Sequence, residues 1–259
     1  MKIVDPKVYI ISETQISPGL YDYLRDHEIG WKPALGVTSA ETLIEFAGRN
    51  CYESWPKEDG TFENKNISRV REGNDIYINN ILKSGHGSVL EHCDVGFLIE
   101  LSRVATHELV RHRAGTAFAQ SSDRYIRCDD IPMYAPDIIK DNEEAYKVYQ
   151  DAVLNIEKSI KELETIYDID NIKDFDTKKI LTSAFRRIAP TGKMCKMVFT
   201  ANHRTLRHII ELRTSKHAEI EIRVVFDLIA KLLKERYPNI YQDMSCNEDG
   251  EWVFLNHKI

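Results

Sequence analysis

Apolar residues follow two different periods along this chain, and each period predicts one kind of element. Along residues 93–101 apolar and polar side chains alternate, which is typical of a half-buried strand. Residues 141–168 instead repeat their apolar positions at the spacing of an amphipathic helix, with Glu and Lys on the other face. The chain therefore predicts both strands and helices.

Shorter segments extend this pattern. Thr38 to Glu41 has the Ser/Thr-x-x-Glu form of a capping box, which predicts a helix start. Further predicted helices cover residues 74–84, 102–111, 178–188, 202–213 and 218–236, and predicted strands cover residues 7–12, 194–201 and 252–255. Helices and strands alternate without a regular βαβ rhythm. We therefore expect one α/β domain over residues 1–259, with a mixed or antiparallel sheet flanked by helices.

Composition limits the class of protein. Hydrophobic residues make up 42% of the chain and charged residues 29%, as in ordinary globular proteins. No apolar run reaches the ~18 residues of a membrane span, and residues 1–5 do not open a secretory signal. The five cysteines are scattered and form no CxxC pair, which fits a reducing cytoplasm. We expect a cytoplasmic protein without a membrane partner.

Charge is unevenly distributed. The net charge of −6 disfavours nucleic-acid binding, yet residues 186–216 hold eight Lys and Arg against the single acid Glu211. A second basic group, Arg111-His112-Arg113, precedes the small residues Gly115 and Ala119, which would let a ligand approach the backbone. Arginine binds phosphate and carboxylate strongly. The two groups predict a pocket for small anions, and solvated helix faces remain the alternative.

Three further segments bear on chemistry. His86 stands between two glycines, in a turn that either lines a ligand or is structural, and Glu91 and His92 lack a metal-site spacing. No cysteine has an obvious activating base, so a covalent cysteine mechanism is not expected. In the helix over residues 202–213, Arg204 and His208 share a face.

Arg213 follows Arg204 by nine residues, or about 900° of helix, and so points to the opposite side. Either this helix lies between two ligand moieties, or Arg213 serves a second pocket. Such a second pocket could lie across a subunit interface.

The residues at 111–125 resemble the motif of the flavin-dependent thymidylate synthases, Arg-His-Arg, seven residues, then Ser, followed by x-Arg-Tyr. Ser121 satisfies the seven-residue spacing, whereas Ser122-Asp123-Arg124-Tyr125 satisfies the second half one residue later. Ser122 is favoured as the counterpart of the family serine because it keeps register with Arg124. Gln120 then stands where many members have Glu.

Further segments are similar to the same family in the same order along the chain. They are residues 47–52 (AGRNCY), 85–92 (GHGSVLEH), 186–190 (RRIAP), 202–208 (NHRTLRH) and 211–219 (ELRTSKHAE).

The resemblance implies a homotetramer that binds FAD and dUMP at subunit interfaces. It implies methylenetetrahydrofolate as carbon donor, NADPH as reductant and dTMP as product. The implied FAD-binding residues are Ser88, Glu91, Arg111, His112, Arg113, Asn202, Arg204 and His208, and the implied catalytic residues are His86 and Arg213. The implied nucleotide-binding residues are His107, Glu108, Gln120, Ser121, Ser122, Asp123, Arg124, Arg186 and Arg213. His107 and Glu108 stand where the family often has Arg-Gln.

Two other functions remain open. A divergent member of the family would attach a different one-carbon group to C5 of a uracil nucleotide. A non-catalytic nucleotide- or RNA-binding protein would use the basic groups without holding flavin, and the net charge disfavours it.

Overall fold

An antiparallel four-stranded sheet forms the centre of the molecule. The computed structural model describes residues 1–57, 59, 61–62, 64–67, 69, 71–127 and 130–257, so Cys128 lies outside the described residues. The strand order is β2-β3-β6-β4, with bounds Lys7–Glu13, Asp94–Ser102, Met194–Asn202 and Thr116–Gln120. All neighbouring strands in this sheet run antiparallel. The expected mixed α/β fold, with an antiparallel sheet flanked by helices, is confirmed.

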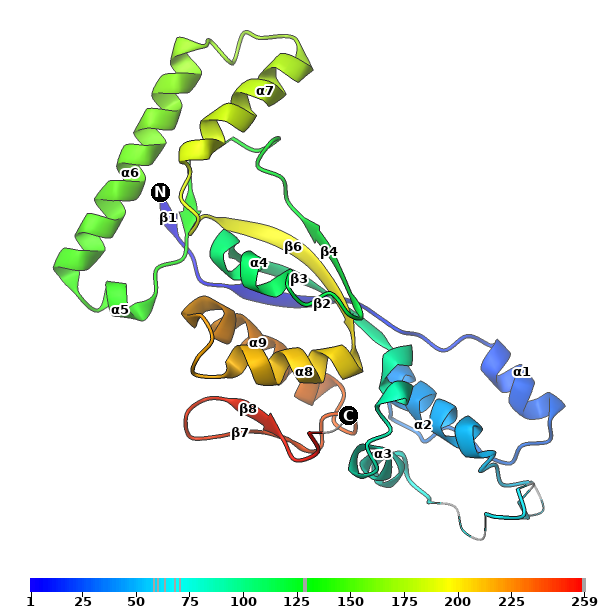
Figure 1. Cartoon of the computed structure of the whole chain (residues 1–259). Helices are drawn as coiled ribbons and strands as arrows, with labels where there is room; N and C mark the ends of the chain where they lie inside the picture. Colours follow the sequence, from blue (N-terminus) through cyan, green and yellow to red (C-terminus); the bar gives the residue numbers. More distant parts are fainter. Residues whose placement is uncertain are drawn as a thin grey trace.

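One face of this sheet carries the main core. The alternation predicted for β3 is observed, since Val95, Phe97, Ile99 and Leu101 are fully buried. Three helices pack near this face, namely α4 (Arg103–Leu109), α8 (His203–Thr214) and α9 (Ile220–Arg236). Figure 1 shows α4, α8 and α9 grouped beside the sheet. The site described below lies where α4 and α8 approach each other.

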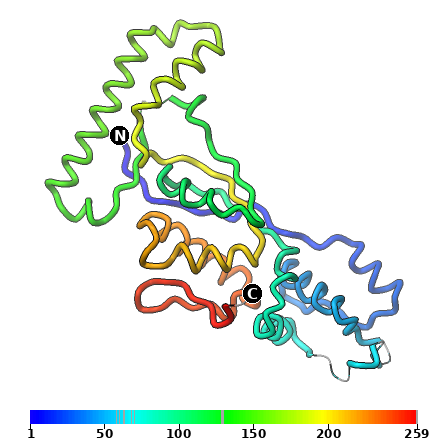
Figure 2. The backbone as a smooth tube through the Cα atoms, in the orientation of Figure 1, coloured from blue at the N-terminus to red at the C-terminus, as the bar shows by residue number. Residues whose placement is uncertain are grey.

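Two lobes extend from opposite ends of this central layer (Figure 2). One lobe contains α1 (Gly19–Asp26), α2 (Ser39–Tyr52) and α3 (Asn74–Lys83). The other contains α5 (Asp137–Lys140), α6 (Glu143–Ile166) and α7 (Phe175–Phe185), with its own apolar cluster. The strands β1 (Lys2–Ile3) and β5 (Pro132–Met133) pair in parallel beside this second lobe.

Local sequence signals set several helix ends. The Thr38 side chain accepts a hydrogen bond from the Glu41 backbone N–H, and the Glu41 carboxylate accepts one from the Thr38 N–H, so the predicted capping box is confirmed. The Asn142 and Asp174 side chains cap α6 and α7 by accepting hydrogen bonds from the Ala145 and Thr177 backbone N–H groups.

One helix boundary needs correction, one predicted strand is confirmed in a separate hairpin, and one strand was not predicted. The helix predicted over residues 102–111 ends at Leu109, so the Arg-His-Arg triplet lies in the turn after α4. The predicted strand at residues 252–255 is β8 (Trp252–Phe254), which pairs with β7 (Met244–Cys246) in a separate hairpin. The strand β4 was not predicted. None of the helices in the described part of the chain has the length and apolar character needed to cross a bilayer.

Candidate functional site

The turn that carries Arg111, His112 and Arg113 is fixed against the start of α8. Asn202 ends β6 and caps α8, and its side chain accepts a hydrogen bond from the Thr205 N–H at 2.8 Å. The Thr205 hydroxyl in turn donates to the Ala114 carbonyl at 3.0 Å. The triplet is therefore held by the same helix terminus that presents Arg204 and His208.

Gly115 makes this close approach possible. Its φ is +67°, and a Cβ placed there would lie 2.5 Å from both Asn202 Nδ2 and Thr205 Oγ1. A side chain at this position would meet steric overlap as well as an unfavourable backbone conformation. The expectation that Gly115 admits a ligand to the backbone is thus corrected: the glycine admits the side chains of α8.

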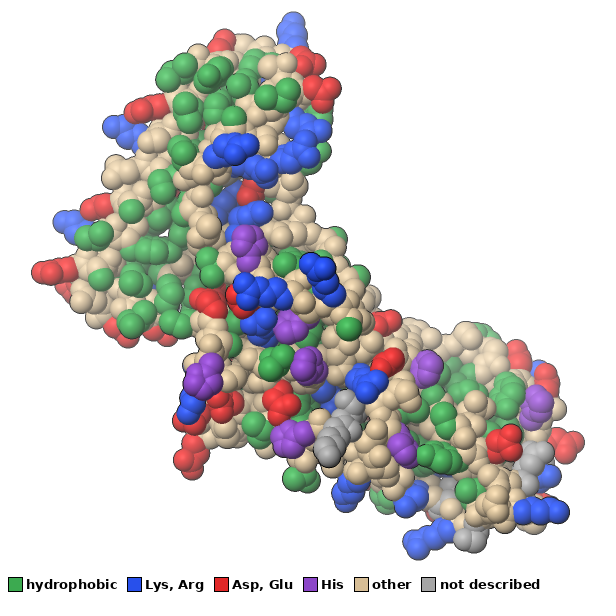
Figure 3. Space-filling model, viewed as in Figure 1, with side chains coloured by type: hydrophobic (Ala, Val, Ile, Leu, Met, Phe, Trp, Pro, Cys, Tyr) green, Lys and Arg blue, Asp and Glu red, His purple; other side chains and the backbone are tan. Residues whose placement is uncertain are grey.

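The triplet and α8 line one cavity, which we call the Arg-His cavity. Its volume is about 470 Å³, and its lining residues are Glu91, Arg111, His112, Arg113, Ala114, Arg204, Thr205, His208 and Ile209. Lys, Arg and His side chains gather in a band that crosses this part of the surface (Figure 3). Such a concentration of cations in an acidic protein favours an anionic ligand.

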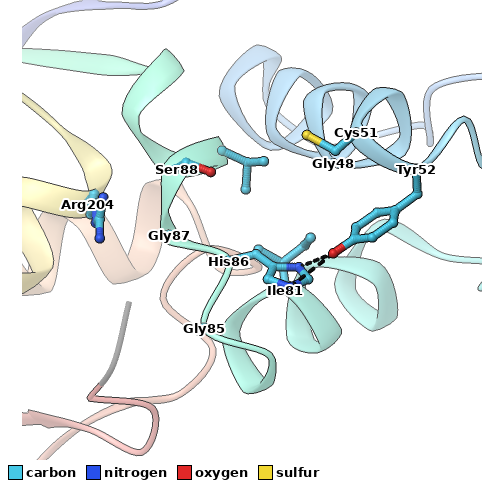
Figure 4. A pocket seen from close by; sticks show the side chains of 10 residues that line it. Gly48, Cys51, Tyr52, Ile81, Gly85, His86, Gly87, Ser88 and Arg204 are labelled. Atoms are coloured by element: carbon cyan, nitrogen blue, oxygen red, sulfur yellow. Dashed lines mark hydrogen bonds between the residues drawn. The ribbon is translucent and has the colours of Figure 1, made fainter.

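A second cavity adjoins the first at Arg204, and we call it the His-turn cavity. It has a volume of about 330 Å³ and lies between the end of α2 and the short helix η1 (Gly87–His92). Its lining residues are Gly48, Cys51, Tyr52, Ile81, Gly85, His86, Gly87, Ser88, Val89 and Arg204. Figure 4 shows Ser88 and Arg204 facing Cys51 and Tyr52 across this space.

Arg204 is the residue that joins the two cavities. Its guanidinium forms an ion pair with Glu91, which follows the His86 turn in sequence. Both side chains are about half exposed, so this pair contributes little to stability and remains accessible to a ligand. A ligand longer than either cavity could pass over Arg204 and occupy both.

Arg213 lies beside the Arg-His cavity and does not line it. Its guanidinium donates to Glu108 Oε2 at 2.7 Å, to the Glu108 carbonyl at 2.9 Å and to His112 Nε2 at 2.7 Å. Helical spacing predicts that Arg213 points away from Arg204, and the two arginines have different partners, since Arg204 pairs with Glu91. The Arg213 side chain nevertheless reaches the cavity wall through His112, whose ring contacts that of His208 with centroids 6.5 Å apart.

His112 is a neutral group in this arrangement. Burial, and then the positive charge of Arg213, lower the pKa of His112 to about 4. The ring nitrogen that accepts from Arg213 must be unprotonated, in agreement with that direction. His112 therefore acts as a hydrogen-bond acceptor for Arg213 near neutral pH.

A second cationic group lies apart from these cavities, between α7 and the segment after β4. Arg124, Lys179 and Arg187 line a cavity of about 440 Å³ together with Asp176, Ile180, Ser183 and Ala184. Arg124 is exposed and lies over the ring of Tyr125, 6.0 Å from its centroid.

Metal-ligand clusters and cysteines were two further kinds of site to consider among the described residues. No group of three or more His, Cys, Asp or Glu side chains in them is arranged to hold a metal ion. The described cysteines, Cys51, Cys93, Cys195 and Cys246, are free thiols. Burial raises the pKa of Cys93 to about 12, which makes its thiol a poor nucleophile.

Comparison with known sequences places this geometry in a family. A sequence model of the thymidylate synthase complementing protein family, Thy1, matches residues 35–239. A flavin-dependent thymidylate synthase of Corynebacterium diphtheriae is 34% identical over 223 residues, covering 85% of this chain and 84% of that protein. The chain belongs to the flavin-dependent thymidylate synthase family.

Two further relatives of this family support the assignment. The flavin-dependent thymidylate synthase of Mycobacteroides abscessus is 30% identical over 98% of this chain and 97% of its own length. A probable flavin-dependent thymidylate synthase of Mycobacterium phage D29 is 35% identical over 92% of this chain and 96% of its own length. The resemblance inferred from the sequence motifs is confirmed.

A solved structure shows a similar fold. The crystal structure of a UMP/dUMP methylase, PolB, from Streptomyces cacaoi bound with 5-Br dUMP superposes with a TM-score of 0.65. It covers 93% of this chain and 96% of its own length at 16% identity, so the likeness concerns the fold alone.

The structure brings together most of the residues that were expected to bind flavin. Glu91, the triplet, Arg204 and His208 line the Arg-His cavity, while His86 and Ser88 line the His-turn cavity. Asn202 is almost fully buried as the cap of α8, so it supports the cavity from behind.

The expected nucleotide-binding residues are divided. Glu108 contacts Arg213, whereas Ser122 and Arg124 follow β4, and Arg186 begins the short helix η2 (Arg186–Ile188). Arg187, and not Arg186, lines the cavity of Arg124. None of Ser121, Ser122, Asp123, Arg124 or Arg186 lines the Arg-His cavity.

Contacts distinguish the two candidate serines. The Ser121 N–H donates to the Lys196 carbonyl, and the Ser121 hydroxyl accepts from the Lys196 N–H at 3.2 Å, so Ser121 extends the β4–β6 ladder. The Ser122 hydroxyl accepts from the Arg124 N–H at 3.4 Å. Asp123 is buried in ion pairs with Arg103 and Lys193, at 3.0 and 2.9 Å.

Two of the remaining expected residues have other environments, and one residue of the site was not expected. The Gln120 amide donates to the Cys195 sulfur at 3.3 Å. His107 is exposed on α4. Tyr52 lines the His-turn cavity but was not predicted by itself, because only the AGRNCY segment that contains it resembles the family.

Proposed function

We propose that this chain is a FAD-dependent thymidylate synthase that converts dUMP to dTMP, with methylenetetrahydrofolate as carbon donor and NADPH as reductant. The observation that carries the proposal is the pair of joined cavities around Arg204, which unite the Arg-His-Arg turn with the His86 turn. Family membership supplies the chemistry that these cavities would serve.

The residues present fit a flavin dinucleotide. Arg111, Arg113 and Arg204 offer guanidinium groups to a diphosphate in the Arg-His cavity, and Ser88 lines the adjoining His-turn cavity. The two cavities meet at Arg204, so a ligand with two ring systems could place one in each, and His86 and His208 would lie near the isoalloxazine. When bound, the flavin would supply the redox chemistry, and the protein would supply position and charge.

Arg213 is the residue that we propose to polarise the uracil. A guanidinium carries five N–H donors, and the bonds to Glu108 and His112 use three of them, which leaves two for a ligand oxygen. A cation fixed in this manner stabilises negative charge that develops on a ring carbonyl. Glu108 and neutral His112 keep the guanidinium in place.

The nucleotide phosphate would bind at Ser122 and Arg124. Because the Ser121 hydroxyl already contacts β6, the Ser122 hydroxyl is better placed to bind an added ligand. Arg186 is proposed to reach the nucleotide from a neighbouring subunit. Its position in η2, outside the cavity of Arg124, supports a site completed by another copy of the chain.

A homotetramer is part of this proposal. The lobe of α6 and α7 exposes many large apolar side chains, as expected of a surface that contacts other subunits: Val148, Leu154, Ile166, Phe175 and Ile180. Light scattering after gel filtration should give about four times the chain mass of 30.0 kDa. A cytoplasmic location is proposed as well, since the described cysteines are free thiols.

The direct test is to purify the protein and record its visible spectrum. A flavin band that bleaches anaerobically with NADPH and responds to dUMP would support the proposal, and dTMP should appear when methylenetetrahydrofolate is added. A colourless protein that FAD cannot reconstitute would rule the proposal out.

A cysteine variant tests whether the protein acts through a nucleophilic thiol. Cys51 is exposed and is the one described cysteine that lines the His-turn cavity. Cys51→Ser should keep kcat within about twofold, because no covalent bond to this residue is proposed. Loss of dTMP formation with flavin retained would contradict a flavin-mediated mechanism.

One observation favours a second candidate within the same family. The carboxylate of Glu108, at a position where the family often has Gln, neutralises Arg213 and would change how the pyrimidine is held. A divergent enzyme could then release another C5 one-carbon product. Chromatography of the product decides between the two, since hydroxymethyl-dUMP in place of dTMP would support the second candidate.

A further inference from the structure

A third cavity shares a wall with the His-turn cavity, and we call it the Arg71 cavity. Its volume is about 340 Å³. Tyr52, Ile81 and His86 line both cavities and therefore form the wall between them. The other lining residues are Arg49, Ser54, Ile67, Arg69, Arg71, Tyr77, Asn80 and Ser84.

The charge of the Arg71 cavity is positive. Its charged lining residues, within the part of the chain that the structure describes, are Arg49, Arg69 and Arg71, and no Asp or Glu is among them. Arg49 is buried and paired with Glu45 at 2.7 Å, so its charge is neutralised internally. The exposed side chains of Arg69 and Arg71 form no ion pair with a described residue. These two guanidinium groups are available to an anion.

Arg49 contributes by positioning the cavity floor. It donates to the Arg71 carbonyl at 2.9 Å and lies over the Tyr77 ring, 4.5 Å from the centroid. The backbone at Arg71 is therefore bonded to the buried Arg49 of α2, which also contacts Tyr77 of α3, while Arg71 itself is exposed. This arrangement resembles an anion site built on a fixed support.

Tyr52 and His86 form a partition that a side-chain rotation could open. The Tyr52 hydroxyl lies 3.1 Å from His86 Nε2 and 3.3 Å from Nδ1, as Figure 4 shows by its dashed lines. Tyr52 is the last residue of α2, is 47% exposed and precedes Glu53, whose φ is +48°. His86 is flanked by Gly85 and Gly87. Tyr52 thus lies at the end of a helix and His86 in a turn, and neither is inside a regular element.

We propose that the Arg71 cavity binds the anionic tail of a co-substrate, and that the Tyr52–His86 pair is the gate through which its reactive ring enters the His-turn cavity. The proposal rests on the proposed function, because it takes the His-turn cavity to be the flavin side of the site. The tail is a set of carboxylates, as in a glutamate chain, or of phosphates, as in a nicotinamide dinucleotide. Arg69 and Arg71 suit both chemistries, and the flavin and nucleotide have separate cations at Arg111, Arg113 and Arg124.

The first experiment compares the double variant Arg69→Gln/Arg71→Gln with Lys65→Gln. Lys65 is an exposed cation in the same segment that does not line the cavity, so it is a matched control. In the holoenzyme we measure the KM for NADPH in anaerobic flavin reduction, and the KM for mono- and triglutamyl methylenetetrahydrofolate in turnover. Loss of two charge-assisted contacts should raise one of these KM values at least about tenfold, while the control stays within about twofold.

The pattern of KM values identifies the source of the anion. A rise for NADPH alone assigns the cavity to phosphates, and a rise that is larger for the triglutamyl folate assigns it to carboxylates. Unchanged KM values for both co-substrates overturn the proposal. Loss of flavin from the double variant also overturns it, because the cavity would then belong to the flavin site. Wild-type protein that holds no flavin instead contradicts the proposed function itself.

The second experiment tests the gate. Tyr52→Phe keeps the ring and removes only the hydrogen bond to His86, whereas Tyr52→Trp enlarges the partition. We expect the rate of the affected half-reaction to rise about twofold or more for the Phe variant and to fall for the Trp variant, with flavin content unchanged. Equal rates for wild type and both variants would remove the gate from the proposal.

Discussion

The two arginine-bearing turns of this protein differ in how far the chain itself completes them. The turn with Arg111 and Arg113 is fixed to α8 through Thr205 and Gly115, and His112 contacts Arg213. The segment with Ser122 and Arg124 leaves its arginine exposed beside two other cations. The first turn is held by contacts within one chain, whereas Arg124 forms no ion pair with a described residue and, in our proposal, is completed by a ligand or another subunit. The proposed flavin and nucleotide parts of the site would then be assembled by different means.

The largest expected effect comes from Arg213, the residue that we propose to polarise the uracil. Arg213→Ala should retain flavin and lower kcat for dTMP formation by about 10²–10³-fold, because the developing charge on the uracil loses its fixed donor. Arg111→Ala should instead weaken flavin binding first, since Arg111 lines the Arg-His cavity. Flavin retention and single-turnover rates separate the two. If both variants lose flavin to the same extent, the proposed division of roles is wrong.

A substitution at Gly115 should destabilise the turn that carries Arg111 and Arg113. Gly115→Ala places a Cβ 2.5 Å from Asn202 and Thr205 atoms at a positive φ, and should lower the free energy of unfolding by about 2–4 kcal/mol. Gly36→Ala is the matched control, because Gly36 has a φ of +79° with nothing within 4 Å. It should cost only about 1–2 kcal/mol. Urea unfolding measures both, and equal losses would show that the contact with α8 is unimportant.

Some parts of this fold follow from local sequence and others depend on distant contacts. The alternation in β3 and the capping box at Thr38 are local signals, and both predictions are confirmed. The strand β4 is five residues of TAFAQ that pair with β6 about eighty residues later, as in the register of Phe118 with Phe199. Its short, partly polar sequence has little strand signal of its own, so only the tertiary pairing defines it.

The site likewise combines features that local sequence predicts with features that depend on distant contacts. Helical spacing alone predicts that Arg204 and His208 share a face and that Arg213 does not. The contact of Arg213 with Glu108 and His112 requires the position of α4 relative to α8, which no local pattern encodes. Likewise, Arg124 and Arg187 line one cavity only because of how α7 packs.

A change in the segment with Ser122 and Arg124 should alter the affinity for dUMP. Arg124→Gln removes an exposed cation and should raise the KM for dUMP about tenfold or more, while flavin content and unfolding stability stay close to those of the wild type. Arg25→Gln is a suitable control, since Arg25 is also exposed but lies on α1 and lines none of these cavities. A fall in flavin content for Arg124→Gln would show that the two turns are not independent.

The smallest expected effect concerns the electrostatics of the fixed turn. Glu108→Gln keeps the size of the side chain and removes the negative charge that pairs with Arg213 and Arg111. The negative charge of Glu108 raises the pKa of His112. Loss of this charge should therefore move the pKa of His112 further below about 4. An NMR titration of the His112 ring protons measures the direction. An upward shift would mean that Arg213 leaves His112 once its carboxylate partner is gone, and that Glu108 holds the guanidinium in place.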